Sequence, residues 1–137
     1  SLHDCWRTTT TPLHGARPSE VDIRLLQFAT ATGAQSFTLG TQSGAGNAVG
    51  TAGTYAIPSS GDAMAFEHPE LTSRGNIWTE SYTVVGNIAI AIDIWVPAKA
   101  DRAALTTLVQ QQYAKVIADP TIAAAAKAAP ALPSPNS

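Results

Sequence analysis

The sequence IWTESYTVVGNIAIAIDIWV, at positions 77–96, decides the fold of this chain. It contains two runs of mostly β-branched and aromatic residues, 77–85 and 88–96, separated by Gly86 and Asn87 alone. Residues of these types favour strands, and a two-residue connection of Gly and Asn is typical of a tight hairpin turn. The stretch therefore predicts an antiparallel β-hairpin.

The turn also fixes which side chains of the hairpin share a face. If Gly86 and Asn87 are the two turn residues, Val85 lies opposite Ile88, and successive side chains alternate between the two faces. A stripe of isoleucines then falls on one face: Ile77, Ile88, Ile90, Ile92 and Ile94. This face should be the core side of the sheet.

The opposite face pairs Trp78 with Trp95 and Glu80 with Asp93, and places Tyr82 next to the acids. Directly opposed residues have Cβ atoms about 5 Å apart, so the two carboxylates are close neighbours flanked by aromatic rings. Like charges in this position destabilise a sheet unless they share a proton, bind a cation or contact an arginine. These five residues are the candidate ligand-binding site.

Three interpretations of the acidic pair stay open. In the first, Arg24 or Arg102 neutralises the carboxylates, or water on the face reduces the repulsion to about 1 kcal/mol. In the second, the rings stack on a ligand whose hydroxyl or amine groups donate to Glu80 and Asp93, as in recognition of a sugar or a peptidoglycan fragment. The third is acid and base catalysis on a glycoside, which needs carboxyl groups about 5 to 9.5 Å apart.

The segment before the hairpin predicts a strand, a short helix and a loop. Residues 21–28 alternate and then become apolar on both sides, which suits a strand inside a sheet. Thr30 is a candidate N-cap for a short helix that ends at Gly40. Positions 40–53 hold five glycines among small and polar residues, which predicts a flexible loop.

Further elements are predicted on either side of the hairpin. Residues 55–57 and 63–67 are short extended segments, and a His-Pro pair is expected to end the second. After the hairpin, Asp101 can cap a helix that continues to about Ala118, with apolar residues at helical spacing. This helix should cover the isoleucine face.

Together these elements predict an α+β domain at 20–118. We expect a mainly antiparallel sheet of about four or five strands, covered on one face by the C-terminal helix and a shorter helix. Residues 1–19 are interpreted as an extended arm that can add an edge strand around 5–10, and 119–137 as an Ala/Pro-rich tail. The tail has little apolar surface to offset the cost of ordering, so arm and tail are expected to contact a protein partner or a second copy of the chain.

Composition excludes several classes of partner. The chain has 137 residues and a net charge of −2, and its eight basic residues are scattered, which argues against binding nucleic acid or anionic lipid. No apolar run reaches the roughly 18 residues of a transmembrane segment. The single Cys5 excludes an internal disulfide, and it is either bridged to another chain or buried beside Trp6.

Other chemical motifs are weak. The glycine-rich stretch 44–50 lacks the Lys-Ser/Thr of a phosphate loop, and His3, Cys5 and His14 have irregular spacing in the arm. His68 is interpreted as a surface loop residue, because no Gly-x-Ser-x-Gly elbow accompanies it. The sequence therefore predicts no catalytic residue, no metal site and no cofactor.

Four runs carry a resemblance to a known group: EVDIRLLQF at 20–28, YAIP at 55–58, VVGNI at 84–88 and LVQQQY at 108–113. They resemble a domain of uncharacterised secreted proteins and lipoproteins of actinobacteria, which is similar to α/β sandwiches of the PsbP and Mog1 type. The resemblance implies an envelope location, a binding or assembly role and no catalytic residues. It also implies a unit that often occurs twice in one chain, so this sequence is interpreted as the second half of a longer precursor.

We therefore expect an extracytoplasmic, non-enzymatic binding or assembly module of a bacterial cell envelope, secreted or at the cell surface. Its partners would be proteins, or a glycan or small polar ligand. Charged residues make up only 13% of the chain, which agrees with a secreted protein. The alternative is a small secreted enzyme that acts on glycan or peptide through Glu80 and Asp93.

Overall fold

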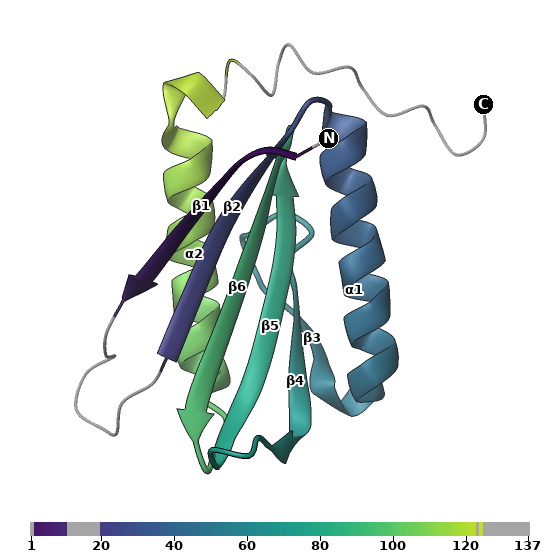
Figure 1. Cartoon of the computed structure of the whole chain (residues 1–137), viewed down its shortest axis with the longest axis vertical. Helices are drawn as coiled ribbons and strands as arrows, with labels where there is room; N and C mark the ends of the chain where they lie inside the picture. Colours follow the sequence, from purple (N-terminus) through teal and green to yellow (C-terminus); the bar gives the residue numbers. More distant parts are fainter. Residues whose placement is uncertain (1, 11–19, 123, 125–137) are drawn as a thin grey trace.

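A computed structural model describes residues 2–10, 20–122 and 124, the first range as backbone only. Within these residues one six-stranded antiparallel sheet is combined with two helices (Figure 1). In chain order the elements are β1 (Leu2–Thr10), β2 (Glu20–Phe28), α1 (Ala31–Gly53), β3 (Thr54–Ala56), β4 (Met64–Leu71), β5 (Asn76–Val85), β6 (Ile88–Pro97) and α2 (Arg102–Ala118). The strand order across the sheet is β1-β2-β6-β5-β4-β3. The predicted α+β class is confirmed: β2 to β6 match the expected strand number, and β1 is the edge strand predicted for the arm.

The hairpin of β5 and β6 has the predicted register along its whole length. Val85 lies opposite Ile88 at the turn, and the pairing continues to the far end of both strands. Gly86 adopts a φ of 56°, a left-handed conformation that glycine takes without strain. The side-chain amide of Asn87 donates to the Phe28 carbonyl oxygen at 2.9 Å, and so ties the turn to the end of β2.

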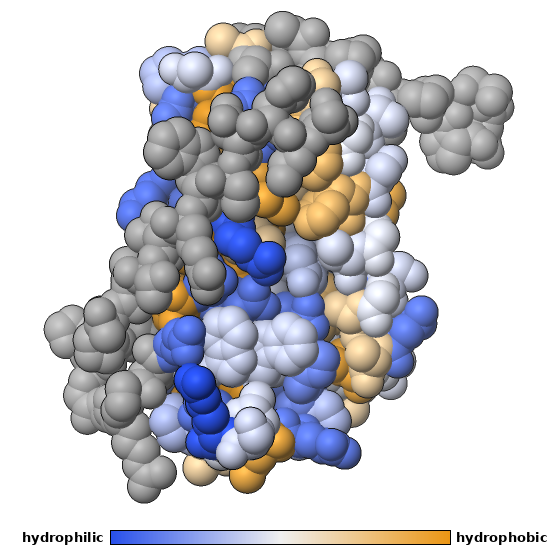
Figure 2. All heavy atoms as spheres, in the orientation of Figure 1, coloured by the Kyte–Doolittle hydropathy of each residue, from blue (hydrophilic) through white to orange (hydrophobic). Residues whose placement is uncertain are grey.

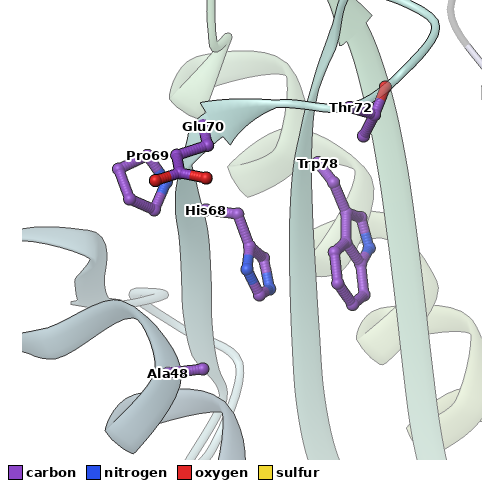
Figure 3. Close-up of a pocket in the computed structure, with 6 residues that line it drawn as sticks. All are labelled: Ala48, His68, Pro69, Glu70, Thr72 and Trp78. Carbon is purple, nitrogen blue, oxygen red and sulfur yellow. The ribbon is translucent and has the colours of Figure 1, made fainter.

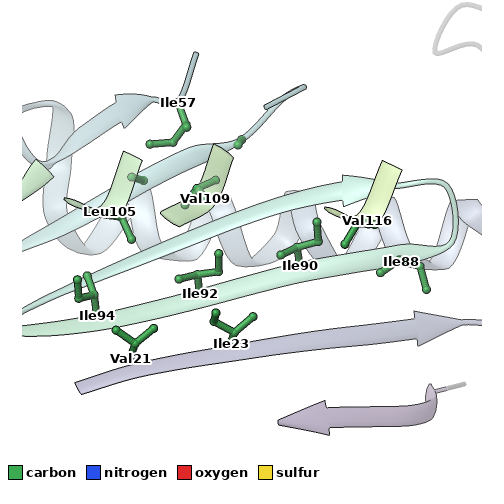
Figure 4. Close-up of a cluster of buried hydrophobic side chains, with 12 residues drawn as sticks. Val21, Ile23, Ile57, Ile88, Ile90, Ile92, Ile94, Leu105, Val109 and Val116 are labelled. Carbon is green, nitrogen blue, oxygen red and sulfur yellow. The ribbon is translucent and has the colours of Figure 1, made fainter. Parts of the chain in front are cut away.

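The isoleucine face is the core, as expected, and α2 covers it (Figure 4). Asp101 is the N-cap of α2, because its carboxylate accepts from the Ala104 amide at 2.9 Å. Leu105, Val109 and Val116 of α2 are buried against the strands. The buried cluster on this face consists of Val21, Ile23, Ile57, Ala63, Ala65, Ile88, Ile90, Ile92, Ile94, Leu105, Val109 and Val116.

The prediction of a short helix followed by a glycine-rich loop is wrong. α1 continues from Ala31 to Gly53, with a break in helical geometry at Gly50, whose φ is 70°. Thr30 is the N-cap, as predicted, and accepts from the Gly33 amide at 3.0 Å. The helix therefore begins where the sequence indicated and ends 13 residues later than Gly40.

Close packing requires glycine at one position of this helix. A Cβ at Gly53 would lie 2.5 Å from the Glu67 carbonyl oxygen, whereas one at Gly46 would make ordinary contact with the Phe66 ring at 3.5 Å. Phe66 is opposite Glu80 in register, so it belongs to the face that α2 does not cover. The prediction that both helices share the isoleucine face is therefore wrong for α1, because small side chains let it pack against the other face.

β4 also differs from the prediction, since it does not end at the His-Pro pair. Its pairing with β5 moves from Glu67 opposite Thr79 to Leu71 opposite Ile77. Residues 68–70 therefore bulge outward opposite Trp78 alone, and a bulge tolerates Pro69 within a strand. This irregularity positions His68 at the candidate site.

Several predictions concern residues outside the described parts of the chain. Contacts of the arm at 11–19 and of the tail at 125–137 lie outside them, as do the side chains of His3, Cys5 and His14. Among the described helices, none has the length and apolar character needed to cross a membrane.

Candidate functional site

The candidate site lies on the face of the sheet opposite α2. In Figure 1, α2 passes behind β2 and β6, while α1 lies along the β4 and β5 side. Figure 2 views the molecule from the side opposite α2, where hydrophilic and near-neutral side chains of the described residues gather over the lower half. The register places Trp78, Glu80 and Tyr82 of β5 on this face, together with Asp93 and Trp95 of β6, as predicted.

Three aromatic rings form a column across β4, β5 and β6. The Trp78 and Trp95 rings are parallel within 5°, with centroids 6.3 Å apart. On the other side of Trp78, the His68 ring stacks at 4.0 Å and 4°. Because Trp78 is held between the other two rings, a ligand can reach mainly its edge and the outer ends of the column.

Glu80 is held by two side chains of this face. His68 Nε2 lies 2.5 Å from Glu80 Oε2, and the Tyr82 hydroxyl donates to Oε1 at 2.5 Å. Glu80 is buried, so its carboxylate depends on these partners in place of water. Burial and the bond to Glu80 raise the pKa of Tyr82, so Tyr82 is a neutral hydrogen-bond donor at neutral pH.

Asp93 is held by a different pair of donors. Arg24 Nη2 donates to Oδ2 at 2.8 Å, and Trp78 Nε1 donates to Oδ1 at 2.9 Å. Burial raises the pKa of Asp93, while the bonds from Trp78 and Arg24 act in the opposite direction. Arg24 therefore pairs with Asp93, as the first interpretation of the acidic pair expected. Arg102, the other candidate, binds Glu67 at 3.0 Å instead.

The two carboxylates thus hold the aromatic column in place from below. One carboxylate anchors His68 and the other anchors Trp78. A third buried acid, Asp22, lies opposite Asp93 in register and was not predicted as part of the site, although it interrupts the apolar strand 21–28. No group of three or more His, Cys, Asp and Glu in the described residues is arranged to hold a metal ion.

An open pocket of about 330 Å³ lies at the His68 end of the column (Figure 3). It is lined by Ala48 of α1, the bulged residues His68, Pro69 and Glu70, and Thr72 and Trp78. Of the five predicted site residues, Trp78 lines this pocket. Tyr82 lies instead beside the Phe66 ring, with centroids 6.4 Å apart.

Sequence reasoning missed His68, which it placed in a surface loop. His68 is 21% exposed at its side chain and bonds to a residue 12 positions away on the neighbouring strand. The available signal was the motif Glu-His-Pro-Glu directly after an extended segment, because a bulge is one of the few places where a sheet tolerates proline.

The sequence matches no family model and no curated protein. The fold is similar to that of the extracellular domain of PknH from Mycobacterium tuberculosis, with a TM-score of 0.60 and 11% sequence identity. The similarity covers 83% of this chain and 66% of the PknH domain, so the chain spans just under two thirds of that domain. At this identity the similarity concerns the fold.

Proposed function

We propose that this chain is a non-enzymatic binding module of a bacterial cell envelope, and that its ligand binds on the face of the aromatic column. The observation that carries the proposal is the stacking of His68, Trp78 and Trp95 beside an open pocket, with two of the rings hydrogen-bonded to buried carboxylates. Side chains fixed before binding lose little conformational entropy when a ligand arrives.

The site residues divide into two roles under this proposal. Trp78 and Trp95 form the contact surface together with His68. Glu80, Tyr82 and Asp93 position that surface, because every carboxylate oxygen of the pair already accepts a hydrogen bond from the protein. The acids therefore act through the rings that they hold.

The extracytoplasmic location rests on two features. The fold similarity is to an extracellular domain of an actinobacterial kinase, and short sequence runs resemble secreted actinobacterial proteins. The low charged fraction of 13% agrees with both. A glycan or peptide fragment of the cell wall is thus the ligand class to test first.

The arrangement supports binding better than glycoside chemistry. Neither Glu80 nor Asp93 lines the pocket, and both are at most 7% exposed. A catalytic acid or base must come within hydrogen-bonding distance of its substrate. The two acids are therefore better placed to support the column than to transfer protons.

Binding of soluble peptidoglycan fragments to the whole chain, measured by calorimetry, tests the proposal. We expect Trp78→Ala to weaken binding by about tenfold or more, as for a central aromatic contact. Ala48→Phe should do the same by filling the pocket from α1 while leaving the column intact. Gln111→Ala, at an exposed position of α2, is the matched control and should bind like the native chain.

Circular dichroism of each variant confirms that the fold is retained. If the native chain binds none of the fragments, or if Trp78→Ala and Ala48→Phe both bind like the native chain, the proposed function is wrong.

A further inference from the structure

We propose that the pocket beside His68 binds an alkylammonium group of the ligand, an inference that rests on the proposed binding function. Two features carry it: an exposed carboxylate at the pocket, and apolar wall atoms that fit an alkyl chain.

The carboxylate is Glu70, which the bulge of β4 brings to the pocket. Glu70 is exposed, and it forms no ion pair or hydrogen bond within the described residues. Figure 3 shows its carboxylate next to Pro69, up and to the left of the His68 ring. It is therefore available to accept hydrogen bonds from an ammonium group.

The pocket walls suit the apolar part of such a group. Pro69, Ala48 and the ring of Trp78 present apolar atoms, and the volume of about 330 Å³ accommodates a short alkyl chain. The chain can lie along these walls while the ammonium group contacts Glu70 at the rim, as lysine side chains do on protein surfaces.

Nuclear magnetic resonance on the ¹⁵N-labelled chain tests the inference with 1-butylammonium chloride as the probe. We expect saturable shifts at residues 68–72 and at the Trp78 indole N–H. The neutral 1-butanol and the anionic butyrate should give no saturable shifts there.

Two variants form a matched pair at this end of the sheet. Glu70→Gln should weaken butylammonium binding about threefold, which is the scale of an exposed ion pair. Arg74→Gln removes a positive charge from the nearby turn between β4 and β5, and should leave the affinity unchanged or raise it. If Glu70→Gln binds butylammonium like the native chain, the inference is wrong.

A parallel titration with soluble peptidoglycan fragments separates this inference from the function beneath it. If the fragments shift the pocket signals and butylammonium does not, the cationic ligand is wrong while the binding function stands. If neither shifts them, both proposals fail.

Discussion

The buried carboxylates of Glu80 and Asp93 lie side by side on neighbouring strands of the sheet. Each has its own donors: His68 and Tyr82 for Glu80, Arg24 and Trp78 for Asp93. Removing one member of such a pair leaves donors without an acceptor, which costs more than the relief of repulsion.

Glu80→Gln should therefore destabilise the chain by about 1.5 to 3 kcal/mol, the scale of hydrogen bonds to a charged group. The free energy of unfolding from urea denaturation at pH 7 measures the change. Glu70→Gln, exposed and without an ion-pair partner in the described residues, is the control and should change stability by less than about 0.5 kcal/mol. A Glu80→Gln variant as stable as the native chain would mean that repulsion dominates the pair.

Asp93 gives a prediction for pH dependence. Burial raises the pKa of Asp93 in the folded chain above the ordinary value of 3.8, which applies to the unfolded chain. At a pH between 3.8 and the raised pKa, the folded chain therefore holds a proton that the unfolded chain has released. The contribution of this group to stability therefore falls as pH rises through that window. Asp93→Asn removes the titration.

The stability of Asp93→Asn relative to the native chain should accordingly rise from pH 3 to pH 7, and urea denaturation at several pH values measures it. A relative stability that falls over this range would show that Arg24 and Trp78, rather than burial, determine the pKa of Asp93.

At the scale of elements, α1 and β4 differ most from what the sequence predicted. Helix propensity argues against five glycines at 40–53, yet the helix packs on β4 and β5, so closely at Gly53 that an added Cβ would lie 2.5 Å from the Glu67 carbonyl oxygen. These contacts join residues far apart in the chain, so local patterns do not reveal them.

Two glycine variants test whether this segment is a packed helix. Gly53→Ala should be strongly destabilising, because its Cβ would meet the Glu67 carbonyl oxygen at 2.5 Å. Gly44→Ala meets nothing within 4 Å and should stabilise by about 0.5 to 1 kcal/mol, as in an exposed helix interior. Thermal unfolding of both variants measures the effect. Equal, near-zero changes would indicate the flexible loop that composition suggested.

The hairpin was predictable to the single residue for a physical reason. A two-residue turn sets the register, and the register alone places Trp78, Glu80, Asp93 and Trp95 on one face. His68 was not predictable in this way, because its position depends on a bulge in a neighbouring strand. The sequence thus identified the hairpin residues of the site but not His68 or the pocket beside it.

At the scale of the whole molecule, the two faces of the sheet differ. α2 and the isoleucine stripe form the apolar core on one side, while among the described residues α1 covers part of the other. The rest of that second face holds the aromatic column, so under the proposed function the ligand binds on the face opposite the core.

Truncation tests whether the tail contributes to assembly instead of to the fold. Ile122 packs against the core, so a chain lacking residues 125–137 should keep its thermal unfolding midpoint within a few degrees. We propose that the same truncation weakens contacts with a partner or a second copy, measured by size-exclusion chromatography. An unchanged elution volume and unchanged partners would contradict a role of the tail in assembly.

The location of bound ligand tests the central claim most directly. In a chemical-shift map of the native chain with soluble peptidoglycan fragments, we predict the largest changes at His68, Glu70 and Trp78, with α2 unaffected. The contradicting result is a map with its largest changes on α2, or at the apolar hollow lined by Leu25 and Ile122 on the opposite face.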